Sequence, residues 1–152
     1  MDQQPVGDAD GVMHSASAQV DDYDLPFWLQ IPVQDYRRWL NRQAVALAKA
    51  DRKRGGAYRV REAMQSIHRA CHACDGHDPY DGLPLRGELL LPSAQSDQDQ
   101  RCPAVGHRQS SPVADFEILS RQTKQAKGQL SAEDYLAHCR AVVQQAERRQ
   151  PS

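Results

Sequence analysis

The segment from Pro103 to Val143 constrains the fold of this chain more than any other. It reads PAVGH, a seven-residue loop RQSSPVA, DFEILS, RQTKQAKGQL and finally SAEDYLAHCRAVV. Apolar and polar residues alternate around Phe116 and Ile118, as they do in a half-buried strand, and the loop has the length of a hairpin connection. We therefore expect two short strands joined by a hairpin, followed by a helix or turn over residues 123–130.

The last helix is the clearest element in the sequence. Ser131 followed three residues later by Asp134 is a signal for a helix N-terminus. The next residues form one apolar stripe at helical spacing: Tyr135, Leu136, Cys139, Val142, Val143 and Ala146. A stripe of this width is typical of a helix that packs on a core. The pattern predicts that this helix closes the core, with Cys139 as a packing residue.

Two further helices are expected before this segment, one from about Gln34 to Arg52 and one from about Tyr58 to Ala73. Each has apolar residues recurring at helical spacing, and Gly55-Gly56 separates the two. A short strand is predicted within residues 83–91, and an exposed loop over residues 92–101. The predicted fold class is α+β, with N-terminal helices, a hairpin–helix unit and a C-terminal packing helix.

The charge distribution divides the chain. Residues 1–36 hold seven acidic residues and no Lys or Arg, so the remainder carries 13 acids against 19 bases. Residues 1–22 are predicted to form a disordered acidic tail, either solvated or lying over a basic surface, and residues 23–148 one domain. No apolar run has the length of about 18–20 residues that a membrane helix needs, and the first residues lack a secretory signal. We therefore expect a cytoplasmic protein without a membrane partner.

The first predicted helix is strongly basic. Between Arg37 and Arg69 there are ten bases and two acids. Arg38, Arg42, Lys49 and Lys53 fall within about 60° of one another on the helix and form one ridge, which Arg52 and Arg54 flank. Such a ridge suits the phosphate backbone of DNA or another nucleic acid. An ordinary solvated helix face is the alternative interpretation.

The segment from Pro103 to Val143 resembles part of a group of bacterial HNH-endonuclease-like proteins, whose core is a ββα-metal unit. The residues that carry the resemblance are Pro103, Val105, His107, Asp115, Phe116, Ile118, Ser120, Thr123, Lys127, Leu130, Ser131, Glu133, Tyr135, Cys139 and Val142. Similar stretches continue upstream, so the resemblance covers roughly residues 25–145. It implies hydrolysis of DNA phosphodiester bonds with Mg²⁺ or a similar divalent ion, and it gives His107 the role of general base.

The same resemblance shows where this chain departs from the family pattern. Gly106 stands where an acidic metal ligand is expected, and Lys124 stands in place of an Asn. A lysine close to a divalent cation is electrostatically unfavourable, although Lys124 could clamp a phosphate directly. Glu117 or Asp115 could supply a substitute carboxylate. Two functions remain open: a metal-dependent endonuclease, or a catalytically inactive relative that binds nucleic acid or a protein partner.

The cysteines allow a zinc alternative. Cys71, Cys74 and Cys102, together with His107 or His77, could form a Cys₃His site. A second CxxC pair is missing, and Cys71 falls on the apolar face of the second helix. The sequence therefore favours packing over zinc binding, and the metal ligands are not identified.

Overall fold

The computed structural model describes residues 22–94 and 99–150 and confirms the α+β fold class. Its elements are α2 (Val33–Lys53), α3 (Val60–Ala73), the 3₁₀ helix η1 (Gly87–Leu90), β1 (Pro103–His107), β2 (Phe116–Ser120), α4 (Arg121–Lys127) and α5 (Ala132–Arg149). The predicted tail lies outside the described residues except for Asp22, whose carboxylate accepts a hydrogen bond from Arg37 (3.0 Å). None of the described helices is long and apolar enough to cross a membrane.

Helices α2 and α3 pack together and provide most of the core. The predicted stripe of α2 is largely buried, with Tyr36 and Leu40 fully enclosed. Helix α3 begins at Val60, two residues later than expected, because the backbone of Arg59 is extended. Tyr58 therefore precedes the helix and is free to turn its ring against Phe116, with the ring centroids 6.1 Å apart.

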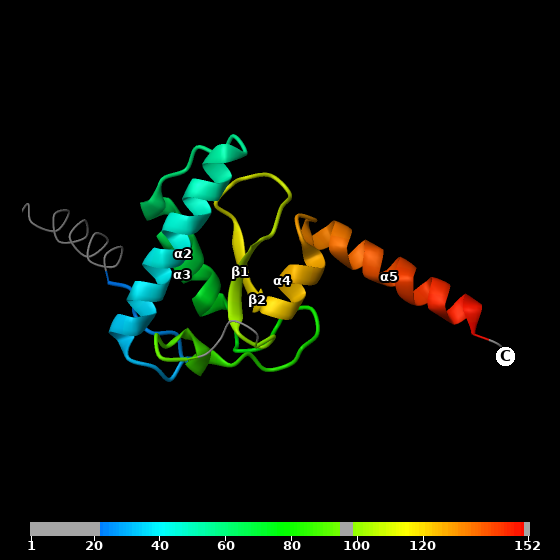
Figure 1. Cartoon of the computed structure of the whole chain (residues 1–152), viewed down its shortest axis with the longest axis horizontal. Helices are drawn as coiled ribbons and strands as arrows, with labels where there is room; N and C mark the ends of the chain where they lie inside the picture. The colour runs from blue at the N-terminus through cyan, green and yellow to red at the C-terminus, as the bar shows by residue number, and fades with distance from the viewer. Residues whose placement is uncertain (1–21, 95–98, 151–152) are drawn as a thin grey trace, which may run out of the picture.

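Strands β1 and β2 form an antiparallel hairpin in which His107 lies opposite Phe116 and Val105 opposite Ile118. Figure 1 shows the hairpin between the α2–α3 pair and α4. Helix α4 follows β2 directly, and its first turn is capped by Ser120, whose side chain accepts a hydrogen bond from the Thr123 N–H (3.0 Å). The hairpin thus presents one face to the core and the other to α4.

The short strand expected within residues 83–91 is wrong. The structure has the 3₁₀ helix η1 there, and only Pro84 forms an isolated bridge, to His77. Leu89 and Leu90 are both buried although they are neighbours in sequence. Successive residues of a strand point to opposite faces, so a helical turn is the conformation that sends both leucines into one core.

The C-terminal helix is present, but the expectation that it packs on the core is wrong. Ser131 caps α5 as predicted, accepting from the Asp134 N–H (3.1 Å). No residue of α5 is buried, and Figure 1 shows the helix extending away from the rest of the molecule. Tyr135 in its first turn contacts Tyr80, with ring centroids 5.4 Å apart. Periodicity identified the apolar face of α5, but it contains no information on which surface that face meets.

Candidate functional site at the end of the basic helix

The central feature of the site is a buried carboxylate, Asp51, that is hydrogen-bonded across the contact between α2 and the hairpin. Asp51, in the last turn of α2, is 1% exposed. Its carboxylate accepts hydrogen bonds from His107 Nε2 (2.6 Å), Tyr58 Oη (2.5 Å) and Arg54 Nη1 (3.3 Å). Burial and the bond to Asp51 raise the pKa of Tyr58, so the phenol stays protonated and donates. Three donors therefore stabilise the buried carboxylate.

The backbone at Gly55 and Gly56 brings these partners together. Gly55 has a φ of 95°, which ends α2 in a left-handed turn. A side chain on Gly56 would lie 2.6 Å from the carbonyl oxygen of Pro112, so the loop after β1 approaches the end of α2 closely. This contact places His107, at the end of β1, beside Asp51.

His107 is held from several directions. Its ring lies edge-on to Phe116, with centroids 5.3 Å apart, and its own carbonyl oxygen accepts a hydrogen bond from Lys127 Nζ (2.6 Å). The side chain is 20% exposed. With Nε2 donating to Asp51, Nδ1 carries the lone pair, and no described residue donates to it. A histidine oriented in this way by a carboxylate has the arrangement of a general base.

Gly106, the expected ligand position, is enclosed by Leu119. A Cβ atom added at Gly106 would lie 2.7 Å from Leu119 Cδ2, and Leu119 is fully buried. The carboxylate of the family pattern is therefore absent, and a leucine side chain fills the adjacent space. Strand alternation also separates this position from His107, whose ring faces α2.

Lys124 does not contact the His107–Asp51 pair. It is an exposed residue of α4, on the other side of the hairpin from α2, and its side chain makes no hydrogen bond or ion pair within the described part of the chain. Surrounding protein nevertheless removes part of the water around its ammonium group and lowers the pKa of Lys124. The structure thus places the two predicted catalytic residues, His107 and Lys124, at separate locations.

The two carboxylates considered as substitute ligands are already engaged. Glu117 accepts a hydrogen bond from Tyr80 Oη (2.6 Å) and lies 3.6 Å from Lys127 Nζ. Burial and Glu117 together raise the pKa of Tyr80. Asp115 accepts a hydrogen bond from Gln109 (2.9 Å). The buried Lys127, together with the half-buried Glu117 and Tyr80, ties α4 to the hairpin, a role that the sequence did not reveal.

The side chains present do not fit the divalent metal that the family resemblance implies. Within residues 22–94 and 99–150, no three His, Cys, Asp or Glu side chains are placed to bind one ion. Cys71, Cys74 and Cys102 are not brought together as a zinc site either. Burial raises the pKa of Cys71 to about 12 and also raises that of Cys74, which favours their protonated thiol forms. We derive no chemical step through a metal.

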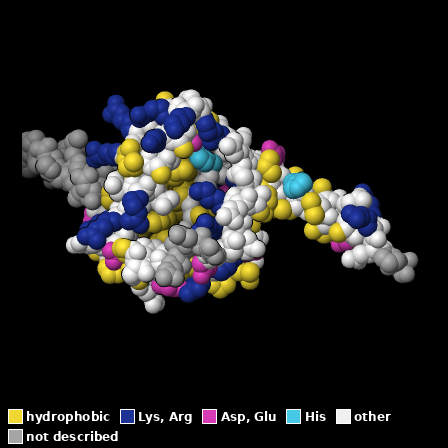
Figure 2. Space-filling model, viewed as in Figure 1, with side chains coloured by type: hydrophobic (Ala, Val, Ile, Leu, Met, Phe, Trp, Pro, Cys, Tyr) yellow, Lys and Arg dark blue, Asp and Glu magenta, His cyan; other side chains and the backbone are white. Residues whose placement is uncertain are grey.

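The four residues of the predicted basic ridge and the flanking Arg52 and Arg54 are all exposed. Arg38 pairs with Asp35 (3.5 Å), and Arg54 binds Asp51 and the carbonyl oxygen of Ser110. The remaining four form no ion pair with any described residue: Arg42, Lys49, Arg52 and Lys53. Figure 2 shows Lys and Arg side chains gathered around the end of α2 near the hairpin loop. This surface is therefore a positive patch whose charges are largely uncompensated.

Part of this patch borders a shallow groove between α2 and α3. The groove has a volume of about 400 Å³ and is lined by Lys49, Arg52 and Lys53 together with Val45, Ala48 and Val60. Arg52 and Lys53 directly follow Asp51, so the groove and the His107–Asp51 pair share the last turn of α2. Comparison of the chain with protein-family models, with curated proteins and with solved structures gave no match.

Proposed function

We propose that the protein binds the sugar–phosphate backbone of nucleic acid through the basic ridge of α2, on a scaffold related to HNH endonucleases. The observation that carries this proposal is the row of unpaired cations Arg42, Lys49, Arg52 and Lys53, three of which line the groove. Exposed cations that lack intramolecular acidic partners can contact phosphates without first breaking an ion pair.

Salt-dependent binding to a short DNA duplex tests this function. Replacing the four unpaired cations with Gln should reduce the slope of log K against log salt by about 3–4, since each phosphate contact contributes about 0.9. The matched control replaces four exposed arginines elsewhere: Arg69, Arg140, Arg148 and Arg149. Equal loss of affinity in both variants would show that net charge, and not the ridge, controls binding.

A second candidate, endonuclease activity, is favoured by the His107–Asp51 pair. Nδ1 of His107 could accept a proton from a water molecule that attacks a phosphodiester, while Asp51 stabilises the resulting imidazolium. Only this proton transfer is assigned, because the ligand set does not fit a metal.

Plasmid nicking with Mg²⁺, measured beside the binding assay, separates the candidates. Nicking that is lost in His107→Ala while DNA affinity is retained supports the endonuclease. Salt-sensitive binding without nicking supports the binding module. Absence of both activities contradicts both proposals and favours a protein-interaction role.

A further inference from the structure

Strand β2 has a free edge. The Arg108 N–H donates to the Asp115 carbonyl and the Arg121 N–H to the Cys102 carbonyl. In an antiparallel pair with this register, Gly106 and Glu117 exchange hydrogen bonds, whereas the peptide groups of Phe116, Ile118 and Ser120 point away from β1. β2 therefore directs a row of N–H and C=O groups outward.

These outward groups are only partly satisfied. The Ser120 N–H donates to Asp78 Oδ2 (2.7 Å), which closes one end of the edge. Phe116 and Ile118 are only 4% and 3% exposed, yet their outward peptide groups have no hydrogen-bond partner among the described residues. These peptide groups are therefore available to pair with an added strand.

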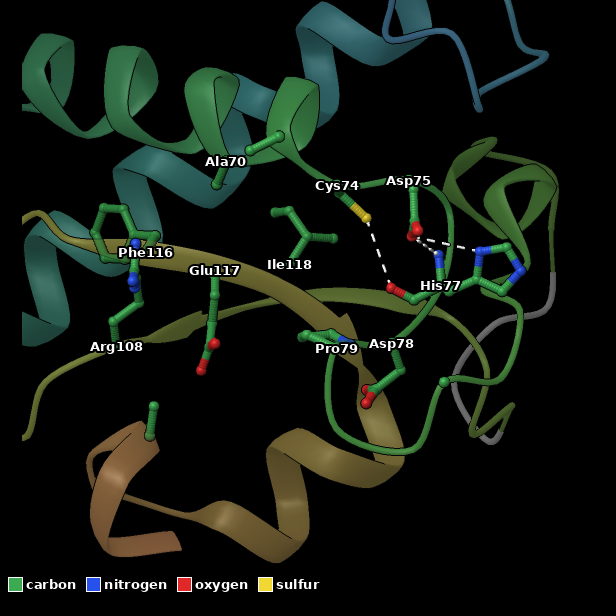
Figure 3. Close-up of a pocket in the computed structure, with 13 residues that line it drawn as sticks. Ala70, Cys74, Asp75, His77, Asp78, Pro79, Arg108, Phe116, Glu117 and Ile118 are labelled. Carbon is green, nitrogen blue, oxygen red and sulfur yellow. Dashed lines mark hydrogen bonds and ion pairs between the residues drawn. The ribbon is translucent and has the colours of Figure 1, made fainter. Parts of the chain in front are cut away.

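A groove of about 810 Å³ runs along this edge and provides room for one. Phe116, Glu117 and Ile118 line it from β2, and the walls carry small side chains, including Ala70 and Ala73 of α3 and Ala132 of α5. Figure 3 shows α3 on one side of β2 and the α4–α5 region on the other, with the strand edge between them. Small residues on both walls leave space beside the strand for an extended chain.

The two ends of the groove carry opposite charges. Arg108, whose side chain is 62% exposed, lies at the Phe116 end. Asp75, whose side chain is exposed and lies 3.4 Å from His77 Nδ1, is at the Ile118 end. A strand running antiparallel to β2 would enter at the acidic end and leave at Arg108. A peptide that complements this groove therefore has a cation near its N-terminus and a carboxylate near its C-terminus.

We infer that the free edge of β2 is a docking site for an extended peptide of a partner protein, which adds to the hairpin as a third, antiparallel strand. The bound strand would pair its main chain with Phe116 and Ile118, and its terminal charges would set its direction. This interaction does not depend on nucleic-acid binding, because the groove lies on a different surface from the ridge of α2.

The acetylated and amidated hexapeptide Lys-Val-Thr-Val-Thr-Glu is the probe. Titration into the full-length protein should give saturable binding, with the amide NMR signals of Phe116 and Ile118 shifted and protected from solvent exchange. The peptide with its Lys and Glu interchanged should bind at least about fivefold more weakly. Lack of saturable binding up to about 1 mM peptide would mean a Kd weaker than about 1 mM and would overturn the inference.

N-methylation distinguishes strand pairing from side-chain contact. Successive residues of a strand direct their N–H groups to opposite sides. Methylating both Val nitrogens or both Thr nitrogens should therefore weaken binding at least about tenfold in one peptide only, the one whose N–H groups face β2. Equal affinity of the two methylated peptides would refute strand addition.

A protein variant provides an independent check. Ala73→Leu at the exposed end of α3 should narrow the groove and weaken binding at least about fivefold, whereas Ala50→Leu on the exposed face of α2 should not. Thermal unfolding confirms that both variants remain folded. Unchanged affinity in Ala73→Leu would place the peptide elsewhere.

Discussion

Removal of the Asp51 carboxylate should destabilise the protein far more than removal of an ordinary helix carboxylate. Asp51→Ala leaves three donors, on His107, Tyr58 and Arg54, without their acceptor. Deleting one partner of a buried ion pair costs about 3–5 kcal/mol. The half-exposed Arg54 can donate to water instead, so we assign the lost free energy of unfolding mainly to the other two donors. We expect the free energy of unfolding to fall by about 3–5 kcal/mol.

Urea unfolding at pH 7 measures this effect, with Asp35→Ala as the control on the same helix. Among the described residues Asp35 pairs only with the exposed Arg38, so its removal should cost less than about 1 kcal/mol. Asp51→Asn keeps one acceptor oxygen and should lie between the two variants.

A double-mutant cycle tests the specific pairing of Asp51 with His107. Residues in direct contact show coupling energies of about 0.5–3 kcal/mol, and this buried pair should lie in the upper half of that range. Additive effects of Asp51→Ala and His107→Ala would refute the pairing. A loss below about 1 kcal/mol in Asp51→Ala would refute the conclusion that the carboxylate holds the end of α2 to the hairpin.

Three further predictions address other buried groups. Lys127→Met removes the ammonium that binds the His107 carbonyl and faces Glu117, and should lower the free energy of unfolding by about 2–3 kcal/mol, whereas Lys124→Met should change it by less than about 0.5 kcal/mol. Gly106→Asp should lower the melting temperature because its side chain would clash with Leu119, and calorimetry should detect no Mg²⁺ binding. The same substitution should lower the melting temperature less in a Leu119→Ala background than in the otherwise unchanged protein. Burial, followed by the charge of a neighbouring histidine, lowers the pKa of His68 to about 4. The unfolded chain therefore takes up the proton first, and stability should decline as pH falls from about 6.5 to 4; urea midpoints should show a smaller decline in His68→Phe.

The candidate site combines features that sequence reasoning identified separately with features that it missed. The basic ridge follows from residue type and spacing, and the role of His107 is what the family resemblance implies. Asp51 is one of two acids in the basic stretch and belongs to the upstream part of the resemblance, but neither pattern indicates that it is the partner of His107. It is 56 residues away in sequence, so no local pattern could link the two. The mechanistic proposal depends on that long-range contact.

What the sequence by itself determined is local. Helical periodicity located α2, α3 and α5, alternation located β2, and Ser131 marked the start of α5, because each signal depends on residues within a few positions of one another. The exposed basic face of α2 follows from the same helical geometry.

Only the tertiary structure decided what each face meets. It buried Asp51 against His107, placed Leu119 beside Gly106, and left most of the α5 stripe and most of the β2 edge without a partner in the described chain. A periodic pattern specifies which residues share a face. The surface opposite that face depends on contacts between distant segments, which form only when the whole chain packs.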